Sequence, residues 1–259
     1  MEELLNLALK ASLDAGKEIL DVYGSGSTEV WEKQDRSPLT EADLRSHRVI
    51  MNYLRETGYP ILSEEGKDIP YEERRQWSRF WLVDPLDGTK EFLKRNGEFT
   101  VNVALIENGK PILGVVHAPA LGVTYFAGVG KGAFKVESEG SPKRLPLFSP
   151  VEGVVRVVAS RSHLSEETER FVESLKGKFE RVEFVAVGSS LKLCMVAEGK
   201  ADIYPRFAPT MEWDTAAGQA IVEGAGGRVV NAQTGKPLLY NKENLLNPYF
   251  IAYRGGYEL

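Results

Sequence analysis

Three groups of acidic residues stand at the expected ends of strands or at the start of a helix, where carboxylates can converge. They are SEEG at residues 63–66, DPLDGT at residues 84–89 and WDTAAG at residues 213–218. Hard divalent cations take carboxylate and carbonyl oxygens as ligands. Converging carboxylates without a cation would repel one another and shift their pKa values. The three groups are therefore candidates for one divalent-metal site.

DPLDGT is the most informative group taken alone. Pro85 fixes its own φ and keeps Asp84 extended, and Gly88 allows a tight turn. On such a turn, Asp84 and Asp87 can converge on one point, and the backbone carbonyl of Leu86 can face the same way. Asp, Pro and Gly are also common turn formers, so a simple turn without a metal is the alternative for this motif.

The other acidic residues also have structural explanations when each is taken alone. Glu64 and Glu65 form a charge pair of the kind that is usually solvated, and Asp214 precedes a good helix sequence, as a helix cap does. Thr40 and Asp43 fit a capping box at the start of a helix. The metal interpretation becomes strong only because all three acidic groups occur in this order with these neighbours.

DPLDGT together with WDTAAG resembles the paired signatures of the inositol monophosphatase superfamily, over nearly the whole chain. Its members are magnesium-dependent, lithium-sensitive phosphomonoesterases with a layered α-β-α-β-α fold. Lys90-Glu91 stands where inositol monophosphatases typically have Thr-Asn. These two residues, with GSSLK at 188–192 and YPRF at 204–207, are similar to the CysQ-type 3'(2'),5'-bisphosphate nucleotidase branch.

The resemblance implies a set of metal ligands. Glu64, Asp84 and the Leu86 carbonyl would hold one Mg²⁺, and Asp84, Asp87 and Asp214 would hold a second, with Asp84 bridging. Two ions about 3.5–4 Å apart can clamp a phosphate between attacking and leaving oxygens. We expect two or three Mg²⁺ per site, Mn²⁺ as a substitute and Li⁺ as an inhibitor.

The resemblance also implies the catalytic pair. Thr89 would position the attacking water, and Asp43 would accept a hydrogen bond from Thr89, so that the pair acts as proton acceptor. Attack would be in line, without a phosphoenzyme. The resemblance favours this role for Asp43 over the capping role, and both roles can hold at once.

Substrate contacts need cations and small hydrogen-bond donors. Lys192 and Arg206 match positions that hold the second phosphate of the nucleotide, although most Lys and Arg are merely surface charges. His163 matches a ligand-contacting His, its alternative being a loop residue before a helix at Ser165. The expected substrate contacts are Glu64, Gly88, Thr89, His163, Ser189, Lys192, Arg206 and Asp214.

The expected reaction is hydrolysis of adenosine 3',5'-bisphosphate to AMP and phosphate, which the branch connects with sulfur metabolism. The alternative is the same chemistry with broad specificity, on inositol monophosphate or fructose 1,6-bisphosphate. A non-enzymatic metal or nucleotide sensor is a third hypothesis. Thr89 and Asp43 disfavour the sensor, since binding alone needs no water activator.

The elements that must position these residues fall into two approximate halves, 1–145 and 150–259, of a single domain of the inositol monophosphatase type. In the first half, apolar periodicity and turn signals predict helices at 3–22 and 40–57, short strands at 59–63 and 80–83, and an antiparallel meander at 99–136 with a hairpin turn at Asn108-Gly109. Residues 138–152 are rich in Ser, Pro and Gly and are interpreted as a linker.

The second half predicts a layered α/β arrangement. Strands are expected at 154–159, 180–187, 201–205, 228–231 and 250–253, and helices at 165–175, 189–198 and 213–223. The fold class is therefore an α+β layered sugar-phosphatase fold, with an antiparallel-sheet half followed by an α/β half.

Composition narrows the classes of protein. The chain has 259 residues, 42% hydrophobic and 27% charged, with a net charge of -5, which excludes a disordered chain and disfavours a nucleic-acid polymer as partner. Cys194 alone cannot form an intramolecular disulfide, and we expect a packed core thiol. The N-terminus lacks the features of a secretory signal and no transmembrane segment is expected, so we predict a cytoplasmic monomer or homodimer.

Overall fold

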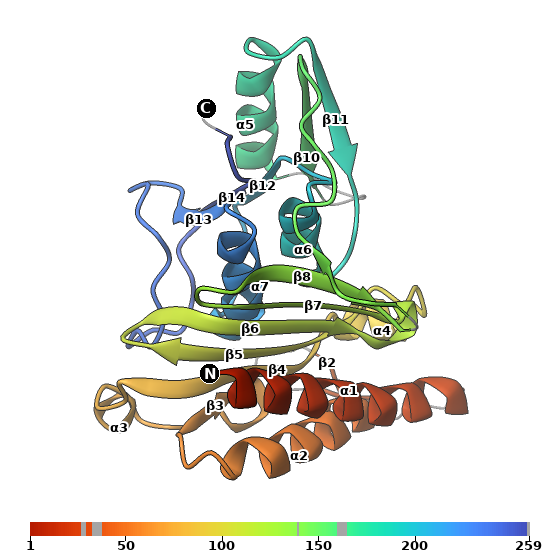
Figure 1. Ribbon diagram of the computed structural model, residues 1–259, viewed down its shortest axis with the longest axis vertical. Helices are drawn as coiled ribbons and strands as arrows, with labels where there is room; N and C mark the ends of the chain where they lie inside the picture. Colours follow the sequence, from red (N-terminus) through yellow and green to blue (C-terminus); the bar gives the residue numbers. More distant parts are fainter. Residues whose placement is uncertain (27–29, 33–37, 139, 160–164, 258–259) are drawn as a thin grey trace.

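The computed structural model describes residues 1–26, 30–32, 38–138, 140–159 and 165–257. Two sheets and three layers of helix alternate through the molecule (Figure 1). Helices α1 (Glu2–Ser25) and α2 (Glu41–Arg55) cover the outer face of a seven-stranded sheet. Helices α6 (Leu191–Glu198) and α7 (Glu212–Gly224) lie between the two sheets, and α5 (Glu166–Lys176) covers the five-stranded sheet. This arrangement confirms the predicted layered α-β-α-β-α fold.

The seven-stranded sheet has the strand order β3-β4-β5-β6-β7-β8-β9. All neighbours pair antiparallel except β3 and β4, which are parallel. The predicted Asn108-Gly109 turn joins β5 to β6, with φ of 50° and 74° at the two residues, as a tight hairpin requires. The strands are β3 (Ile61–Ser63), β4 (Arg79–Asp87), β5 (Thr100–Glu107), β6 (Lys110–Ala118), β7 (Val123–Gly128), β8 (Gly132–Glu137) and β9 (Lys143–Arg144).

The five-stranded sheet has the order β11-β10-β12-β14-β13. Strand β10 is parallel to both β11 and β12, whereas β14 is antiparallel to its two neighbours. The alternation of strand and helix predicted for this half is confirmed, with boundaries shifted by a few residues. The strands are β10 (Val154–Val158), β11 (Arg181–Val185), β12 (Ile203–Arg206), β13 (Arg228–Asn231) and β14 (Phe250–Tyr253).

The segment expected to be a plain linker is partly a structural element, so that interpretation is corrected. Lys143 and Arg144 form β9, which pairs with β8 and completes the seven-stranded sheet. Leu145 is buried in the core between the two sheets. The sequence also did not predict the short elements β1 (Val30–Glu32), β2 (Pro38–Thr40), η1 (Glu64–Gly66), α3 (Tyr71–Arg74) and η2 (Pro119–Leu121). A further short helix, α4 (Thr89–Leu93), directly follows Gly88.

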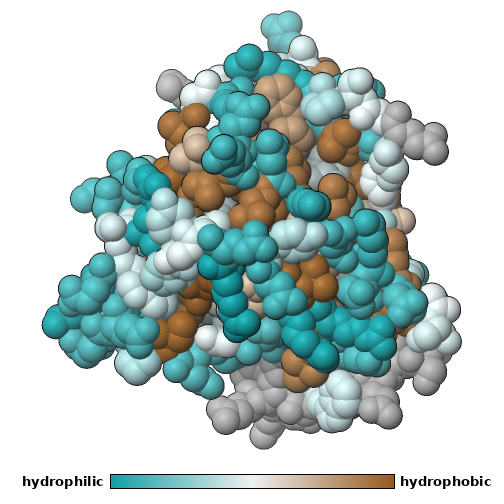
Figure 2. Space-filling view, turned by 60° about the horizontal axis from the view of Figure 1, so that its bottom comes forward, coloured by the Kyte–Doolittle hydropathy of each residue, from teal (hydrophilic) through white to brown (hydrophobic). Residues whose placement is uncertain are grey.

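Apolar side chains collect mainly in the interior. Helices α1 and α2 pack on one face of the seven-stranded sheet, and α6 and α7 pack on the other. Cys194 is fully buried in α6, as predicted for a core thiol. Figure 2 shows a face on which hydrophilic residues predominate and hydrophobic ones form scattered patches. Among the residues that the structure describes, no helix has the length and apolar character needed to cross a membrane.

Candidate metal and phosphate site

Strand β4 brings Asp84 and Asp87 to one side of the sheet through a bulge. Asp84 pairs with Asn102 of β5 and Asp87 pairs with Thr100, so β4 advances three residues while β5 advances two. Residues three apart in a regular strand point to opposite faces, and one extra residue restores them to the same face. The expectation that the strand stops before Asp84 and a turn follows is therefore wrong, because β4 continues through the bulge to Asp87. The convergence of the two carboxylates is confirmed.

Asp214 completes the carboxylate cluster from the other half of the chain. It lies in the first turn of α7, and its Oδ2 accepts a hydrogen bond from the Met211 backbone N–H at 2.7 Å. One carboxylate oxygen from each of Asp84, Asp87 and Asp214 lies within 4.8 Å of the others. Asp214 is therefore not the N-cap residue, which is Met211, but it caps the helix from the third helical position and is also a member of the cluster.

The cluster is electrostatically strained without a cation. Burial raises the pKa of Asp84 well above its usual value, and the neighbouring carboxylates of Glu64 and Asp87 raise it further. Burial and the charge of Asp87 likewise raise the pKa of Asp214. A divalent cation offsets both effects, because its positive charge stabilises the ionised form of carboxylates that are buried and close to one another. These oxygen donors fit a hard cation such as Mg²⁺.

Glu64 and the Leu86 carbonyl lie beside this cluster. Glu64 directly follows β3, whose last residue, Ser63, pairs with Val83 of β4. Glu64 therefore stands next to Asp84, in agreement with its effect on the Asp84 pKa. The Leu86 side chain is buried on the α1–α2 side of the sheet, and its carbonyl oxygen is 3.5 Å from Thr89 Oγ1. The fold thus brings three of the five predicted ligands together, places Glu64 near Asp84, and leaves the Leu86 carbonyl as a predicted ligand.

Asp43 bridges a helix cap and Thr89. Its Oδ2 accepts hydrogen bonds from the Thr40 backbone N–H at 2.8 Å and from Thr40 Oγ1 at 2.6 Å, which confirms the capping box. Its other oxygen, Oδ1, is 3.4 Å from Thr89 Oγ1. Asp43 is almost fully buried, and Thr89 is the first residue of α4 after Gly88, whose φ is 90°. The two predicted catalytic side chains are within reach of each other.

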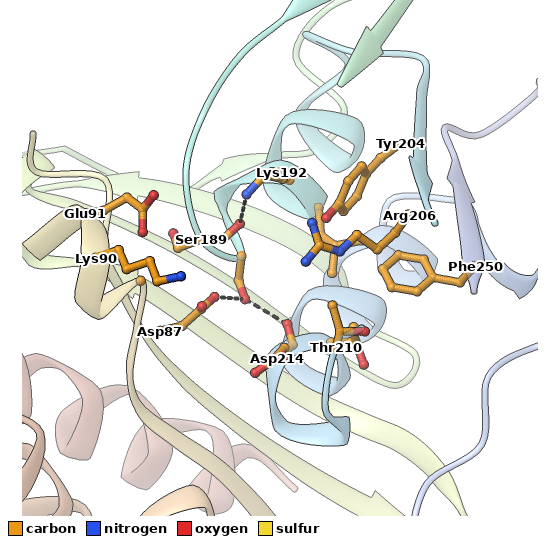
Figure 3. Close-up of a pocket in the computed structure, with 14 residues that line it drawn as sticks. Asp87, Lys90, Glu91, Ser189, Lys192, Tyr204, Arg206, Thr210, Asp214 and Phe250 are labelled. Carbon is orange, nitrogen blue, oxygen red and sulfur yellow. Dashed lines mark hydrogen bonds between the residues drawn. The ribbon is translucent and has the colours of Figure 1, made fainter. Parts of the chain in front are cut away.

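A pocket of about 400 Å³ opens beside the carboxylates (Figure 3). Lys90 and Glu91 of α4 line one side, and Arg206 and Phe250 of the five-stranded sheet line the other. Lys192 lies between the two sides. The pocket thus joins the acidic cluster to cationic side chains within one concavity, as a doubly anionic ligand requires.

Two of these cations, Lys192 and Arg206, are partly buried in the wall of the pocket. Lys192 is half-buried, with Nζ 3.4 Å from the Ser189 carbonyl oxygen, and burial lowers its pKa. Arg206 Nη2 donates to the Pro209 carbonyl at 3.2 Å. Arg206 Nε is buried and has no hydrogen-bond partner. Lys192 and Arg206 are therefore less exposed than ordinary surface charges, and their role as substrate contacts stays a prediction.

The remaining predicted substrate contacts have mixed outcomes. Gly88 and Ser189 line the pocket, Ser189 with a left-handed φ of 48° just before the N-cap of α6. The helix expected to begin at Ser189 instead begins at Leu191. His163 lies outside the described residues. Tyr204 and Phe250, whose rings cross at 89° and a centroid distance of 5.6 Å, line the pocket without having been singled out as substrate contacts.

A hydrogen-bond network behind Asp87 was not predicted from the sequence. Ser190 Oγ lies 2.6 Å from Asp87 Oδ2 and 2.8 Å from the Asp214 carbonyl oxygen. Asn102 Nδ2 donates to Ser190 Oγ at 2.8 Å. Ser190 occurs within the GSSLK motif, but nothing in the local sequence distinguishes its role from that of Ser189. Asn102 appears only as one residue of a meander strand.

Comparison with known proteins agrees with this geometry. Residues 1–252 match the model of the inositol monophosphatase family. The 3'(2'),5'-bisphosphate nucleotidase CysQ of Escherichia coli strain K12 is 49% identical over 252 residues, covering 95% of this chain and 98% of that protein. The protein of the same name from Buchnera aphidicola is 43% identical over 256 residues, covering 96% of this chain and 93% of that protein.

Solved structures give the same result. CysQ from Bacteroides thetaiotaomicron, a bacterial member of the inositol monophosphatase family, superposes with a TM-score of 0.89 at 48% identity, covering 100% of this chain and 99% of that one. The Thermotoga maritima IMPase superposes with a TM-score of 0.75 at 28% identity, covering 98% and 93% of the two chains.

Proposed function

Because the chain belongs to the inositol monophosphatase family, we propose that it is a metal-dependent phosphatase that hydrolyses adenosine 3',5'-bisphosphate to AMP and phosphate. The observation that carries this proposal is the placement of three carboxylates within 4.8 Å of one another beside a pocket lined by Lys192 and Arg206. The first feature fits a cation-bound reacting phosphate, and the second fits another phosphate on the same substrate.

The proposed metal ligands are Glu64, the Leu86 carbonyl and the carboxylate cluster. We propose that they hold two or three Mg²⁺ ions, that Mn²⁺ can substitute and that Li⁺ inhibits. When bound, the metal supplies charge neutralisation of the reacting phosphate and activation of water. The raised pKa of Asp84 supports this assignment, because a buried acidic cluster without a functional cation is costly to the fold.

In this proposal, Asp43 and Thr89 together orient the attacking water and accept its proton. The Thr89 hydroxyl, 3.4 Å from Asp43 Oδ1, orients the attacking water by accepting its hydrogen bond and passes its own hydrogen bond to Asp43. Thr40 holds the other oxygen of Asp43, which fixes the direction of the carboxylate. The attack is in line and forms no phosphoenzyme.

The cations of the pocket favour a bisphosphate nucleotide over inositol monophosphate in this proposal. A substrate with one phosphate would leave Lys192 and Arg206 without a phosphate partner. A second phosphate would satisfy both, including the Arg206 Nε that has no hydrogen-bond partner. Gly88, Ser189 and His163 are proposed as further substrate contacts, together with Glu64, Thr89 and Asp214.

The cellular setting is part of the proposal. We propose a cytoplasmic enzyme of sulfur metabolism, active as a monomer or homodimer, whose halves 1–145 and 150–259 form one catalytic unit. The single catalytic unit is supported by the carboxylate cluster, which takes two members from the first half and Asp214 from the second.

A substrate panel tests the proposal. Purified protein with Mg²⁺ is given adenosine 3',5'-bisphosphate, inositol 1-phosphate and fructose 1,6-bisphosphate, and released phosphate and nucleotide are measured. We expect AMP and phosphate, with the highest kcat/KM for the bisphosphate nucleotide. Faster release from inositol 1-phosphate or fructose 1,6-bisphosphate would favour broad specificity instead. No release from any of the three would overturn the enzymatic function.

A further inference from the structure

The Ser190 hydroxyl stands where the two halves of the carboxylate cluster meet. It is 2.6 Å from Asp87 Oδ2, on β4, and 2.8 Å from the carbonyl oxygen of Asp214, on α7. Ser190 itself is the N-cap residue of α6 and is only 4% exposed. One hydroxyl therefore contacts two of the three clustered residues, which lie 127 positions apart from each other in the numbering (Asp87 and Asp214).

The neighbours of Ser190 determine where its proton points. Thr100 Oγ1 donates to Asn102 Oδ1 at 3.0 Å, so the amide NH₂ of Asn102 faces the other way. That NH₂ donates to Ser190 Oγ at 2.8 Å, and Ser190 must then donate its single proton to Asp87 or to the Asp214 carbonyl. A carboxylate is the stronger acceptor and gives the shorter distance, so the proton points to Asp87.

The two residues that direct the Ser190 proton are shielded from water, whereas Ser190 and Asp87 line the pocket. Thr100 and Asn102 are on the same face of β5 and are at most 1% exposed. They lie opposite Asp87 and Asp84, respectively, in the sheet register. Because Asp87 Oδ2 is engaged by Ser190 inside the protein, Oδ1 is the oxygen available to ligate a cation.

We propose that Ser190 is a positioning residue that presents Asp87 to the metal through one oxygen. Asn102 acts through Ser190 by directing its proton, and also directly, because its Nδ2 donates to Asp87 Oδ2 at 3.4 Å; Thr100 orients the Asn102 amide. This inference rests on the proposed function, because it takes Asp87 and Asp214 as metal ligands. It goes further in assigning the orientation of the Asp87 carboxylate to one hydroxyl, which is neither a proposed metal ligand nor a proposed substrate contact.

Loss of an outer hydrogen-bond partner typically weakens metal binding by about 10–100-fold. The test measures the Mg²⁺ concentration that gives half of the metal-induced rise in the unfolding temperature of metal-stripped, full-length protein. For Ser190→Ala we expect this concentration to rise about 10–100-fold, and Ser190→Thr, which keeps the hydroxyl, should restore it to within a few-fold. An Mg²⁺ requirement for Ser190→Ala equal to that of the unchanged protein would overturn the proposal.

Ser12→Ala is the matched control. Ser12 is also fully buried, and its Oγ donates to the Ala8 carbonyl at 2.8 Å within α1, remote from the carboxylates. Its loss should change the metal-free unfolding temperature without changing the Mg²⁺ requirement. An Mg²⁺ requirement that rises equally in Ser12→Ala and Ser190→Ala would show a general effect on the fold and would overturn the proposal.

Asn102→Ala provides a second route if Ser190→Ala does not fold. It removes the donor that directs the Ser190 proton, so we expect a smaller rise in the same Mg²⁺ concentration; no rise would overturn the proposal. Thermal shifts with Mg²⁺ need no turnover. A protein that shows them, with the expected variant effects, but hydrolyses no phosphate ester would contradict the proposed function and leave the role of Ser190 supported.

Discussion

Asp84 illustrates a conflict between stability and function at a single residue. Its carboxylate is nearly inaccessible to solvent and faces Glu64, Asp87 and Asp214. Burial and like charge both raise its pKa, which means that the folded, metal-free protein bears a cost whenever Asp84 is ionised. Binding of a cation by the Asp84 carboxylate would offset this cost.

We predict that Asp84→Asn lowers kcat/KM by more than about 100-fold, beyond the usual effect of losing an outer partner of a metal ligand. The same variant should unfold at a higher temperature than the unchanged protein in EDTA. An acid whose folded-state pKa is raised above its unfolded value destabilises the folded protein as pH rises and the acid ionises. The gain in unfolding temperature from Asp84→Asn should therefore be absent below about pH 4 and grow as pH rises through the folded-state pKa. Circular-dichroism melts across pH measure it; a lower melting temperature in EDTA at pH 8 would contradict the account.

Lys192 gives a prediction for the pH dependence of binding. Burial lowers its pKa, although Asp87 acts in the opposite direction, so its charge is lost at lower pH than that of a solvated lysine. We expect KM for adenosine 3',5'-bisphosphate to rise at alkaline pH, and Lys192→Ala to raise KM about 10–100-fold at neutral pH and to remove that rise. A phosphate monoester without a second phosphate is the control. Equal effects on both substrates would show that Lys192 does not bind the second phosphate.

The residues that carry chemistry were largely predictable, and the residues that support them were not. DPLDGT and WDTAAG contain the three clustered carboxylates, and their residue types are distinctive enough to be found in the sequence. Ser190 and Asn102 are 88 positions apart and become partners only through the packing of α6 against β5. No local pattern encodes that contact, so it could not be inferred from the sequence.

At the scale of elements, the bulge in β4 shows what local patterns miss. Asp-Pro and Asp-Gly are typical of turns, which is why the strand was expected to end at Val83. The structure continues β4 to Asp87 because β5 pairs with it on both sides of the bulge. The pairing partner, and not the local sequence, determines the outcome, and Pro85 is tolerated because a bulge needs no regular ladder hydrogen bond there.

The start of α2 allows the two roles of Asp43 to be separated. Thr40→Ala removes the hydrogen bond that the hydroxyl donates to Asp43 Oδ2 and the one that it accepts from the Asp43 backbone N–H, and should cost about 1 kcal/mol of stability, with kcat lowered only a few-fold. Asp43→Asn keeps a side-chain oxygen for the cap but removes the charge that receives the proton, so kcat should fall about 100-fold or more while stability changes less. Unfolding curves and initial rates of the two variants measure this. A larger loss of kcat in Thr40→Ala than in Asp43→Asn would contradict the catalytic role.

The approach of α7 to the sheet gives a second prediction at this scale. A Cβ at Gly114 of β6 would come within 2.8 Å of Ala220 Cβ on α7, the helix that carries Asp214. Gly114→Ala should therefore destabilise the protein by about 1–3 kcal/mol and also raise the Mg²⁺ concentration needed for activity. Gly24→Ala is the control, because a Cβ at Gly24 meets nothing within 4 Å. Unchanged stability and Mg²⁺ requirement in Gly114→Ala would show that this contact does not place Asp214.

At the scale of the whole molecule, the two halves of the chain meet at the site. Strand β4 contributes Asp84 and Asp87, α7 contributes Asp214, and the cationic pocket takes Lys192 and Arg206 from the second half. The order of strands and helices in each half was predictable from periodicity and turn signals. How closely α6 and α7 pack on the seven-stranded sheet was not, since it depends on shape complementarity between distant segments. The net charge of -5 equals in number the carboxylates of Asp43, Glu64 and the three-residue cluster, so bound cations would leave the remaining surface close to neutral.

The most direct test of the account is the initial rate of phosphate release from adenosine 3',5'-bisphosphate as Mg²⁺ is added back to metal-stripped protein, at constant ionic strength. We predict no release without Mg²⁺, a saturable rise on addition, and no comparable rise for Asp84→Asn at any Mg²⁺ concentration. Release at the full rate in the presence of a chelator, or an Asp84→Asn variant that responds to Mg²⁺ like the unchanged protein, would contradict the claim that these carboxylates hold the metal that drives hydrolysis.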